Sequence, residues 1–203
     1  MPIEPPEAPK PSIEALHAML PALIGSAGVR QNAPHFAASL LASPQSLASP
    51  GLSYPVYALG LSDVASGAGL RKAKLSAWRH EFASGDEVVS AEVSAGRRPQ
   101  FSGLNVNSRF RSVQEELRSA AQGAGRDFAG RSYEARLLQI SAMGVRALWL
   151  KAKSRSDADV VIPLAPSPRQ LTAGRRYPPE EFIGALKGAA ETMLRDDAPG
   201  KGA

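Results

Sequence analysis

The chain lacks cysteine, has few aromatic residues and contains no long apolar run. Its 203 residues include no cysteine, and Phe, Trp and Tyr together make up 6%. The absence of cysteine excludes disulfides, thiol catalysis and thiolate metal sites, although it does not locate the protein. Much of the 43% hydrophobic fraction is alanine, so we expect a modest core.

No segment approaches the roughly 18 consecutive apolar residues that a membrane span needs. The N-terminal sequence MPIEPPEAPKPS is acidic and rich in proline, whereas a signal peptide is basic and then apolar. We therefore expect a soluble protein of bacterial type, with the cytoplasm as its default location.

The formal net charge of +5 leaves contact with anionic partners open. A nucleic-acid module usually concentrates its basic residues on one element, but here arginines alternate with acidic residues such as Glu115 and Glu116. This pattern favours a mixed, solvated surface. The alternative is a weak nucleic-acid binder that uses Arg97, Arg98, Arg109, Arg111 and Arg118.

The apolar periodicity predicts an α+β fold with an antiparallel or mixed sheet of about five to six strands covered by helices. Five prolines in residues 1–11 predict a disordered arm. After this arm we expect three parts along the chain: an N-terminal helical segment at 12–42, an α+β domain at 54–195 and a disordered tail at 196–203. Residues 42–55, rich in Ser, Ala, Pro and Gly, predict a linker or long surface loop.

Alternating residues predict strands at Tyr54–Leu61, Lys74–Phe82 and Glu87–Ser94, and the last two form a hairpin. Ser108–Gln122 has one apolar stripe, which is typical of a helix that covers a sheet face. The start at Pro178-Pro179-Glu-Glu predicts the last helix.

The densest apolar stretch lies between Glu134 and Pro166 and fits two periods. A helix over residues 133–153 would carry Gly144 in its interior, at a cost of about 1 kcal/mol. Two strands, Arg136–Ser141 and Val145–Lys151, would instead use Gly144 in a tight turn. We favour the strands, with the second one central. Asp159–Leu164 predicts a further short strand, which Pro163 confines to an edge.

The run Gly67-Ala-Gly69-Leu-Arg71-Lys72 could offer backbone amides and two cations to a phosphate. It has no third glycine and no G-K-[ST], so a flexible hairpin loop is favoured. An enzyme with a non-motif active site near this 62–72 glycine-rich loop stays an alternative.

The remaining polar motifs do not identify a catalytic or metal site. His17, His35 and His80 lack metal-ligand spacing. Asp157 and Asp159 could bind a hard cation together with Glu134, but turn chemistry explains a lone D-x-D more simply. No G-x-S-x-G is present. We predict no catalytic residue, cofactor or metal from these patterns, and enzymatic activity stays open.

The large aromatics fit core positions best, although one of them could anchor a partner. We therefore expect an interaction domain that binds another protein or itself. The candidates for partner or anion contact are Trp78, Trp149, Arg97, Arg98, Arg71 and Lys72.

We predict that nucleic acid binds weakly. Replacing Arg97, Arg98, Arg109 and Arg111 with glutamine should change DNA affinity little, because interleaved acidic residues lower the local potential. DNA titrations at two salt concentrations check this. A sub-micromolar, salt-steep affinity that the quadruple variant loses would contradict it.

Overall fold

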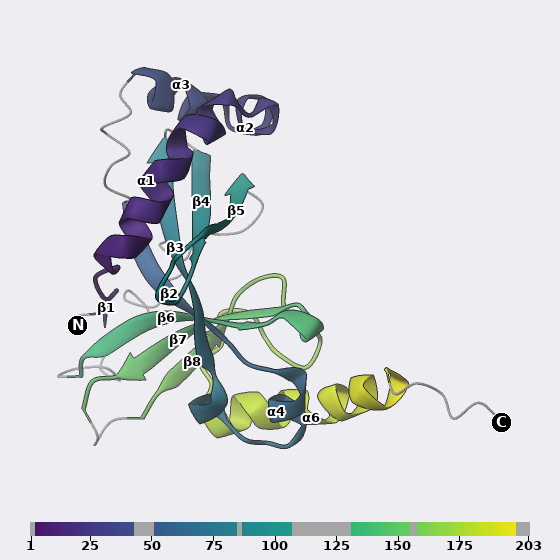
Figure 1. The fold of residues 1–203 in the computed structure, drawn as a ribbon. Helices are drawn as coiled ribbons and strands as arrows, with labels where there is room; N and C mark the ends of the chain where they lie inside the picture. The colour runs from purple at the N-terminus through teal and green to yellow at the C-terminus, as the bar shows by residue number, and fades with distance from the viewer. Residues whose placement is uncertain (1–2, 43–50, 85–86, 107–130, 155–157, 198–203) are drawn as a thin grey trace.

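The computed structural model describes residues 3–42, 51–84, 87–106, 131–154 and 158–197 (Figure 1). No helix in these ranges is both long and apolar enough to cross a membrane. The helices are α1 Lys10–Gly25, α2 Ala27–Asn32, α3 Pro34–Ala42, α4 Leu61–Ala65 and α6 Pro179–Asp196, with 3-10 turns η2 Leu70–Lys72 and η4 Ser141–Met143. The strands are β1 Ile3–Glu4, β2 Leu52–Ala58, β3 Lys74–Ser84, β4 Glu87–Ser94, β5 Phe101–Val106, β6 Tyr133–Ile140, β7 Val145–Ala152 and β8 Val160–Pro163.

One mixed sheet holds the described strands together. Its order is β5-β4-β3-β2-β6-β7-β8, and β1 also pairs with β6. The β2–β6 and β1–β6 pairs are parallel, and the other pairs are antiparallel. The predicted α+β class, with a mixed sheet and an N-terminal helical segment, is confirmed. The sheet exceeds the expected five to six strands because the sequence analysis did not identify β1 and β5.

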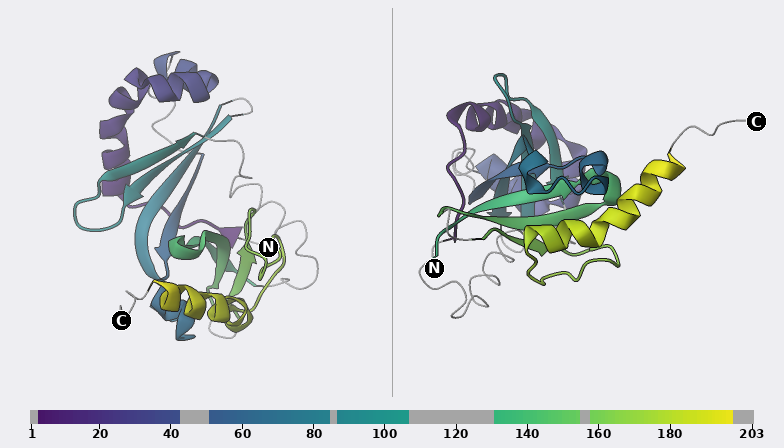
Figure 2. Two further views of the ribbon diagram at one scale, coloured as in Figure 1. Left: turned by 90° about the vertical axis from the view of Figure 1, so that its right-hand side faces the viewer. Right: turned by 90° about the horizontal axis from the view of Figure 1, so that it is seen from below.

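Two groups of helices lie at opposite ends of the sheet (Figures 1 and 2), and the strand register places both on the same face. Pro55 of β2 pairs with Trp78 of β3, and Trp78 pairs with Val93 of β4. Val93 belongs to the apolar cluster beneath α1, α2 and α3. Tyr57 lies opposite Leu138, in the cluster beneath α4 and α6. Since Pro55 and Tyr57 are two residues apart in one strand, they face the same way. A third cluster lies on the opposite face and includes buried Tyr54, Val56, Leu137, Leu148 and Ile162.

The stretch from Glu134 to Pro166 forms strands, as predicted, and the helical alternative is wrong. Strands β6 and β7 pair along their whole length, and Gly144 takes a left-handed φ of 62° in the turn between them. β7 lies between β6 and β8, so it is central, and Trp149 is buried. Pro163 lies in β8, at the edge of the strand order, where a missing backbone donor is tolerated.

The structure differs from the sequence predictions at several segments. Ile3 and Glu4 were expected in a disordered arm, but they pair with β6. The sequence pattern did not reveal this strand, because a two-residue ladder depends on backbone hydrogen bonds and leaves no apolar periodicity. The helix expected from Ser12 begins at Lys10, since proline is tolerated in a first turn. Residues 62–72, expected as a loop, include most of α4 and all of η2. The helix predicted for Ser108–Gln122 lies outside the described residues, as do residues 198–203.

A buried histidine ties α1 to the sheet. The Nε2 atom of His80 lies 3.0 Å from Oγ of Ser12 on α1, and its Nδ1 atom lies 2.9 Å from Oγ of Ser53 on β2. A neutral imidazole can satisfy both hydroxyls, one as donor and one as acceptor. Burial, together with the charge of nearby His17, lowers the pKa of His80 to about 4. The folded protein therefore keeps this ring neutral.

This pKa predicts a loss of stability in mild acid. Between pH 6.5 and about 4 the unfolded chain binds a proton at His80 that the folded chain does not, so stability falls as the pH falls through this window. From pH 7 to pH 5 the loss due to His80 should be about 2 kcal/mol. Urea unfolding at both pH values should show His80→Gln losing less than the wild type. His35→Gln, on the exposed surface of α3, is the control, and equal losses in all three proteins would contradict the assignment.

Candidate functional site

A cleft of about 880 Å³ opens at the β6–β7 end of the sheet. Its floor consists of Tyr57 on β2, Arg136 on β6 and Trp149 on β7. One wall is the glycine-rich segment 67–73, and the other is the first part of α6. The cleft thus combines three separate parts of the chain, and the sheet register determines how they meet.

The glycine-rich wall is a structured turn and not a flexible hairpin loop. Gly67 and Gly69 take φ values of 71° and 74°, which glycine adopts without strain. The turn is anchored from both sides, because Val64 of α4 and Leu70 of η2 are buried in the same apolar cluster as α6. This leaves Arg71 exposed at the rim of the cleft.

Helix α6 forms the second wall because its two sides differ. Phe182, Leu186 and Ala190 are buried against the sheet, at spacings of four residues. Gly184 and Lys187 line the cleft. Apart from the adjacent residues and the backbone of α6 itself, no atom lies within 4 Å of the position that a Cβ at Gly184 would occupy, so glycine here keeps the cleft open.

Arg136 is held against both aromatic rings of the floor. The rings of Tyr57 and Trp149 meet edge to face, with centroids 5.3 Å apart. The guanidinium carbon of Arg136 lies 4.7 Å from the Tyr57 centroid and 4.8 Å from that of Trp149. Its Nε donates to Oε1 of Glu134 over 2.7 Å. A planar guanidinium fixed in this way is a preformed donor fork.

Asp159 connects the floor to the start of β8. Its carboxylate accepts hydrogen bonds from Trp149 Nε1 at 3.0 Å, Lys151 Nζ at 3.2 Å and the Ala152 amide at 3.0 Å. The cation site considered for Asp157, Asp159 and Glu134 therefore has no support, since donors already surround Asp159 and Asp157 lies outside the described residues. Across the described ranges, no group of three or more His, Asp or Glu could hold a metal.

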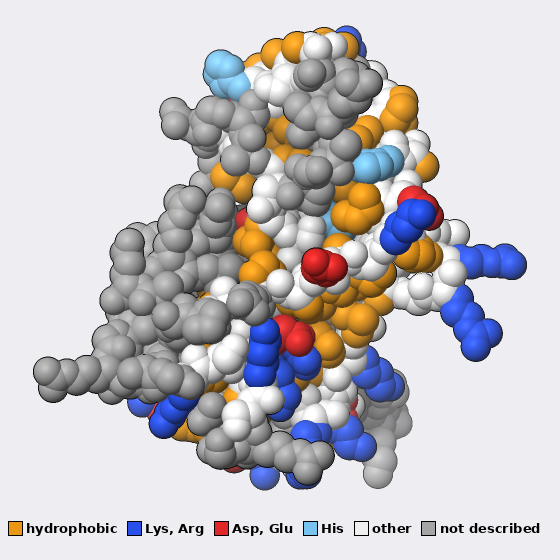
Figure 3. Space-filling view, turned by 90° about the vertical axis from the view of Figure 1, so that its left-hand side faces the viewer, with side chains coloured by type: hydrophobic (Ala, Val, Ile, Leu, Met, Phe, Trp, Pro, Cys, Tyr) orange, Lys and Arg blue, Asp and Glu red, His pale blue; other side chains and the backbone are white. Residues whose placement is uncertain are grey.

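Of the six candidate contact residues, the structure brings Arg71 and Trp149 together in the cleft. Lys72, next to Arg71, is exposed but does not line the cleft. Trp78 is buried in β3, with 7% of its surface exposed, and Arg97 and Arg98 are exposed in the turn before β5. The space-filling view in Figure 3 shows cationic and acidic side chains interspersed on one face of the molecule.

The sequence analysis missed Arg136 and Lys187 as site residues. One indication was present: Arg136 occupies an inward position of a strand whose neighbours Leu138 and Ile140 are apolar. A cation at such a position is costly unless an ion pair or a bound ligand compensates for its burial. Lys187 gave no comparable indication, because its role depends on how α6 docks.

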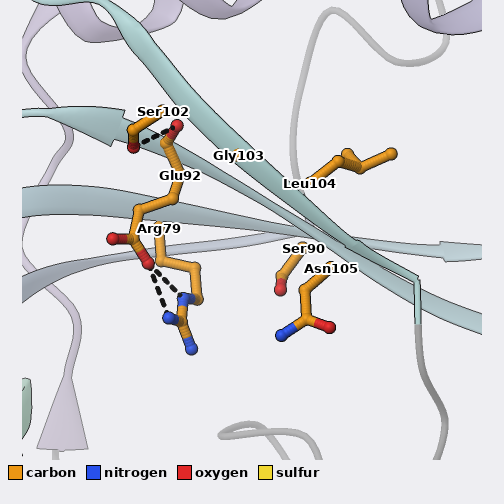
Figure 4. A pocket seen from close by; sticks show the side chains of 7 residues that line it. All are labelled: Arg79, Ser90, Glu92, Ser102, Gly103, Leu104 and Asn105. Carbon is orange, nitrogen blue, oxygen red and sulfur yellow. Dashed lines mark hydrogen bonds and ion pairs between the residues drawn. The ribbon is translucent and has the colours of Figure 1, made fainter. Parts of the chain in front are cut away.

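A second, smaller cavity of about 240 Å³ lies on strands β3, β4 and β5 (Figure 4). Arg79 donates to Oε2 of Glu92 from Nη2 at 2.6 Å and from Nε at 3.1 Å. Gly103 lies opposite Glu92 in the ladder and contributes no side chain. Burial, and then the charge of Glu81, raises the pKa of neighbouring Tyr54 well above its usual value. Since the Arg79 and Glu92 charges satisfy each other, we assign this cavity a structural role.

Trp149 should be essential for stability. Trp149→Ala removes a buried ring and one donor to Asp159, at a cost of about 3–5 kcal/mol in the free energy of unfolding. Trp149→Phe keeps an aromatic ring and loses the donor, so about 1–3 kcal/mol is expected. Urea unfolding measures both, and an alanine variant as stable as the wild type would contradict a core position.

The lining of the cleft contains neither Ser, Thr, Cys nor His among the residues that the structure describes. The described lining therefore holds no serine, threonine or cysteine nucleophile with a histidine base. No family model matches the chain, and comparison with curated proteins and with solved structures gave no significant match.

Proposed function

We propose that the chain is a binding domain for another protein, and that it receives a short segment of that partner in the cleft between residues 67–73 and α6. The cleft itself is the observation that supports this proposal. Its volume lies within the range of about 300–1,000 Å³ that is typical of ligand sites. Apolar walls with a few convergent polar groups are the usual composition of such sites.

The alternative of an enzyme at the glycine-rich loop is less well supported. The described lining offers two carboxylates, and Asp159 already accepts three sets of donors. Glu180 on α6 is then the remaining acidic group of the described lining, which contains no serine, threonine, cysteine or histidine. A non-catalytic role accounts for these residues without further assumptions.

The nucleic-acid alternative lacks a stacking platform at this cleft. Binding of single strands commonly uses exposed aromatic faces on which bases stack. Trp149 is only 5% exposed, and the guanidinium of Arg136 lies over both Trp149 and Tyr57. The floor therefore presents the guanidinium group of Arg136 in the place where a base would need an exposed aromatic ring.

A pair of glycines on α6 allows a direct test. Gly184 lines the cleft, whereas Gly188, one turn later, does not. Apart from the adjacent residues and the backbone of α6, no atom lies within 4 Å of a Cβ built at either position, so a variant with leucine at either one should fold and should gain up to about 1 kcal/mol of helix propensity. We expect Gly184→Leu to fill the cleft and Gly188→Leu to leave it open.

The measurement is selection of short peptides from a random display library on immobilised protein, followed by affinity measurement of the recovered peptides. Peptides selected on the wild type should bind Gly188→Leu equally and Gly184→Leu at least about tenfold more weakly, a difference of about 1.4 kcal/mol. Equal binding to both variants would refute the cleft as the site. Light scattering shows whether the partner is instead a second copy of the chain.

A further inference from the structure

The described lining of the cleft has an excess of positive charge. It contains the four cations Arg71, Arg136, Lys151 and Lys187 against the two carboxylates Asp159 and Glu180, a net charge of +2. Lys151 and Asp159 pair with each other at 3.2 Å. Arg136 and Lys187 each have a carboxylate partner just outside the lining, Glu134 at 2.7 Å and Glu191 at 4.0 Å, so Arg71 is the cation of the lining without a carboxylate partner among the described residues.

Arg136 has donors left over for a ligand. Its Nε is bound to Glu134, and its terminal amino groups meet no acceptor among the described residues. The side chain is 18% exposed and lies over two rings, so it is held in place with little freedom. An arginine fork fixed in one orientation recognises the planar oxygens of a carboxylate by paired hydrogen bonds.

The other two cations lie at the sides of the cleft. Arg71 is exposed and makes no hydrogen bond or ion pair in the described part of the chain. Lys187 reaches Glu191 at 4.0 Å across one helical turn, a half-exposed pair that contributes little. Both can turn toward an anionic group without breaking a strong interaction.

The same cleft has apolar surface next to these cations. Leu70 and Ile183, one from each wall, are buried members of the cluster that also contains Trp149, and both line the cleft. Ala68 and Ala73 add small side chains to the glycine-rich wall. A ligand that fits must therefore combine a negative charge with an apolar group.

We infer that the partner segment is an acidic, apolar peptide that places a carboxylate of Asp or Glu on Arg136 and a neighbouring apolar side chain between Leu70 and Ile183. This inference rests on the proposed function, because it specifies the segment that the cleft receives. Arg71 and Lys187 strengthen the field around the carboxylate. Glu180 disfavours a second carboxylate on its side of the cleft.

The probes are two pools of short fluorescent peptides. In the first pool Asp or Glu alternates with Leu or Phe, and in the second Asn or Gln replaces the acids. Fluorescence anisotropy should show the wild type binding the acidic pool at least about tenfold more tightly than the amide pool, with the difference decreasing as salt is raised. Equal affinity for the two pools would overturn the inference.

Two substitutions locate the interaction. Arg136→Lys keeps the charge and removes the fork, and it should weaken acidic peptides about tenfold. Arg71→Gln, at the exposed rim, should weaken them several-fold without affecting the fold, while Lys72→Gln is the matched control and should bind as the wild type does. If Arg71→Gln and Lys72→Gln behave alike and Arg136→Lys, shown to be folded, binds normally, the carboxylate does not lie in this cleft.

The outcomes separate this inference from the proposed function. If the random library yields peptides that bind the wild type and not Gly184→Leu but that carry no net charge, the proposed binding cleft stands and the acidic segment is refuted. Peptides that Gly184→Leu still binds would refute the cleft itself. Inorganic phosphate and acetate can also be compared as competitors of the acidic pool. If phosphate displaces these peptides at concentrations where acetate does not, the anion site is specific for phosphate and the inference of a carboxylate ligand is overturned.

Discussion

The hydrogen bonds that converge on Asp159 hold together the end of the sheet that carries the cleft. A carboxylate whose side chain is only 14% exposed is costly unless donors surround it, and here the donors come from Trp149, Lys151 and the Ala152 amide. This arrangement fixes the entry to β8 against the end of β7. It also fixes the indole of Trp149, whose ring contacts Tyr57 and Arg136.

The walls of the cleft depend on the same apolar cluster as its floor. Val64 and Leu70 anchor the glycine-rich segment in that cluster, and Phe182 and Leu186 anchor α6 there. The cleft is consequently formed without a bound ligand, and a preformed site of this kind reduces the entropy cost of the binding that we propose. The helices at the other end of the sheet contact a separate cluster and, through Ser12 and His80, are held by a pH-sensitive contact.

The sequence predicted the fold class well and the site only in part. Alternation identified β3 and β4, the turn residue Gly144 favoured β6 and β7 over a helix, and Pro163 identified an edge strand, because these patterns follow from local backbone geometry. The pairing of Ile3 with β6 and the docking of α6 depend on tertiary contacts, which leave little trace in local periodicity. For the same reason Arg71 and Trp149 could be named as separate candidates, while their meeting in one cleft with Arg136 could not.

The exchange rate of the Trp149 indole proton tests this account most directly. The chain has two tryptophans, so a proton–nitrogen NMR spectrum should contain two indole signals, and Trp78→Phe assigns them. A buried Nε1 bonded to Asp159 should exchange slowly with deuterium, and Asp159→Asn should accelerate that exchange. Exchange in the wild type as fast as that of a solvent-exposed indole would show that Trp149 is not fixed in the floor of the cleft.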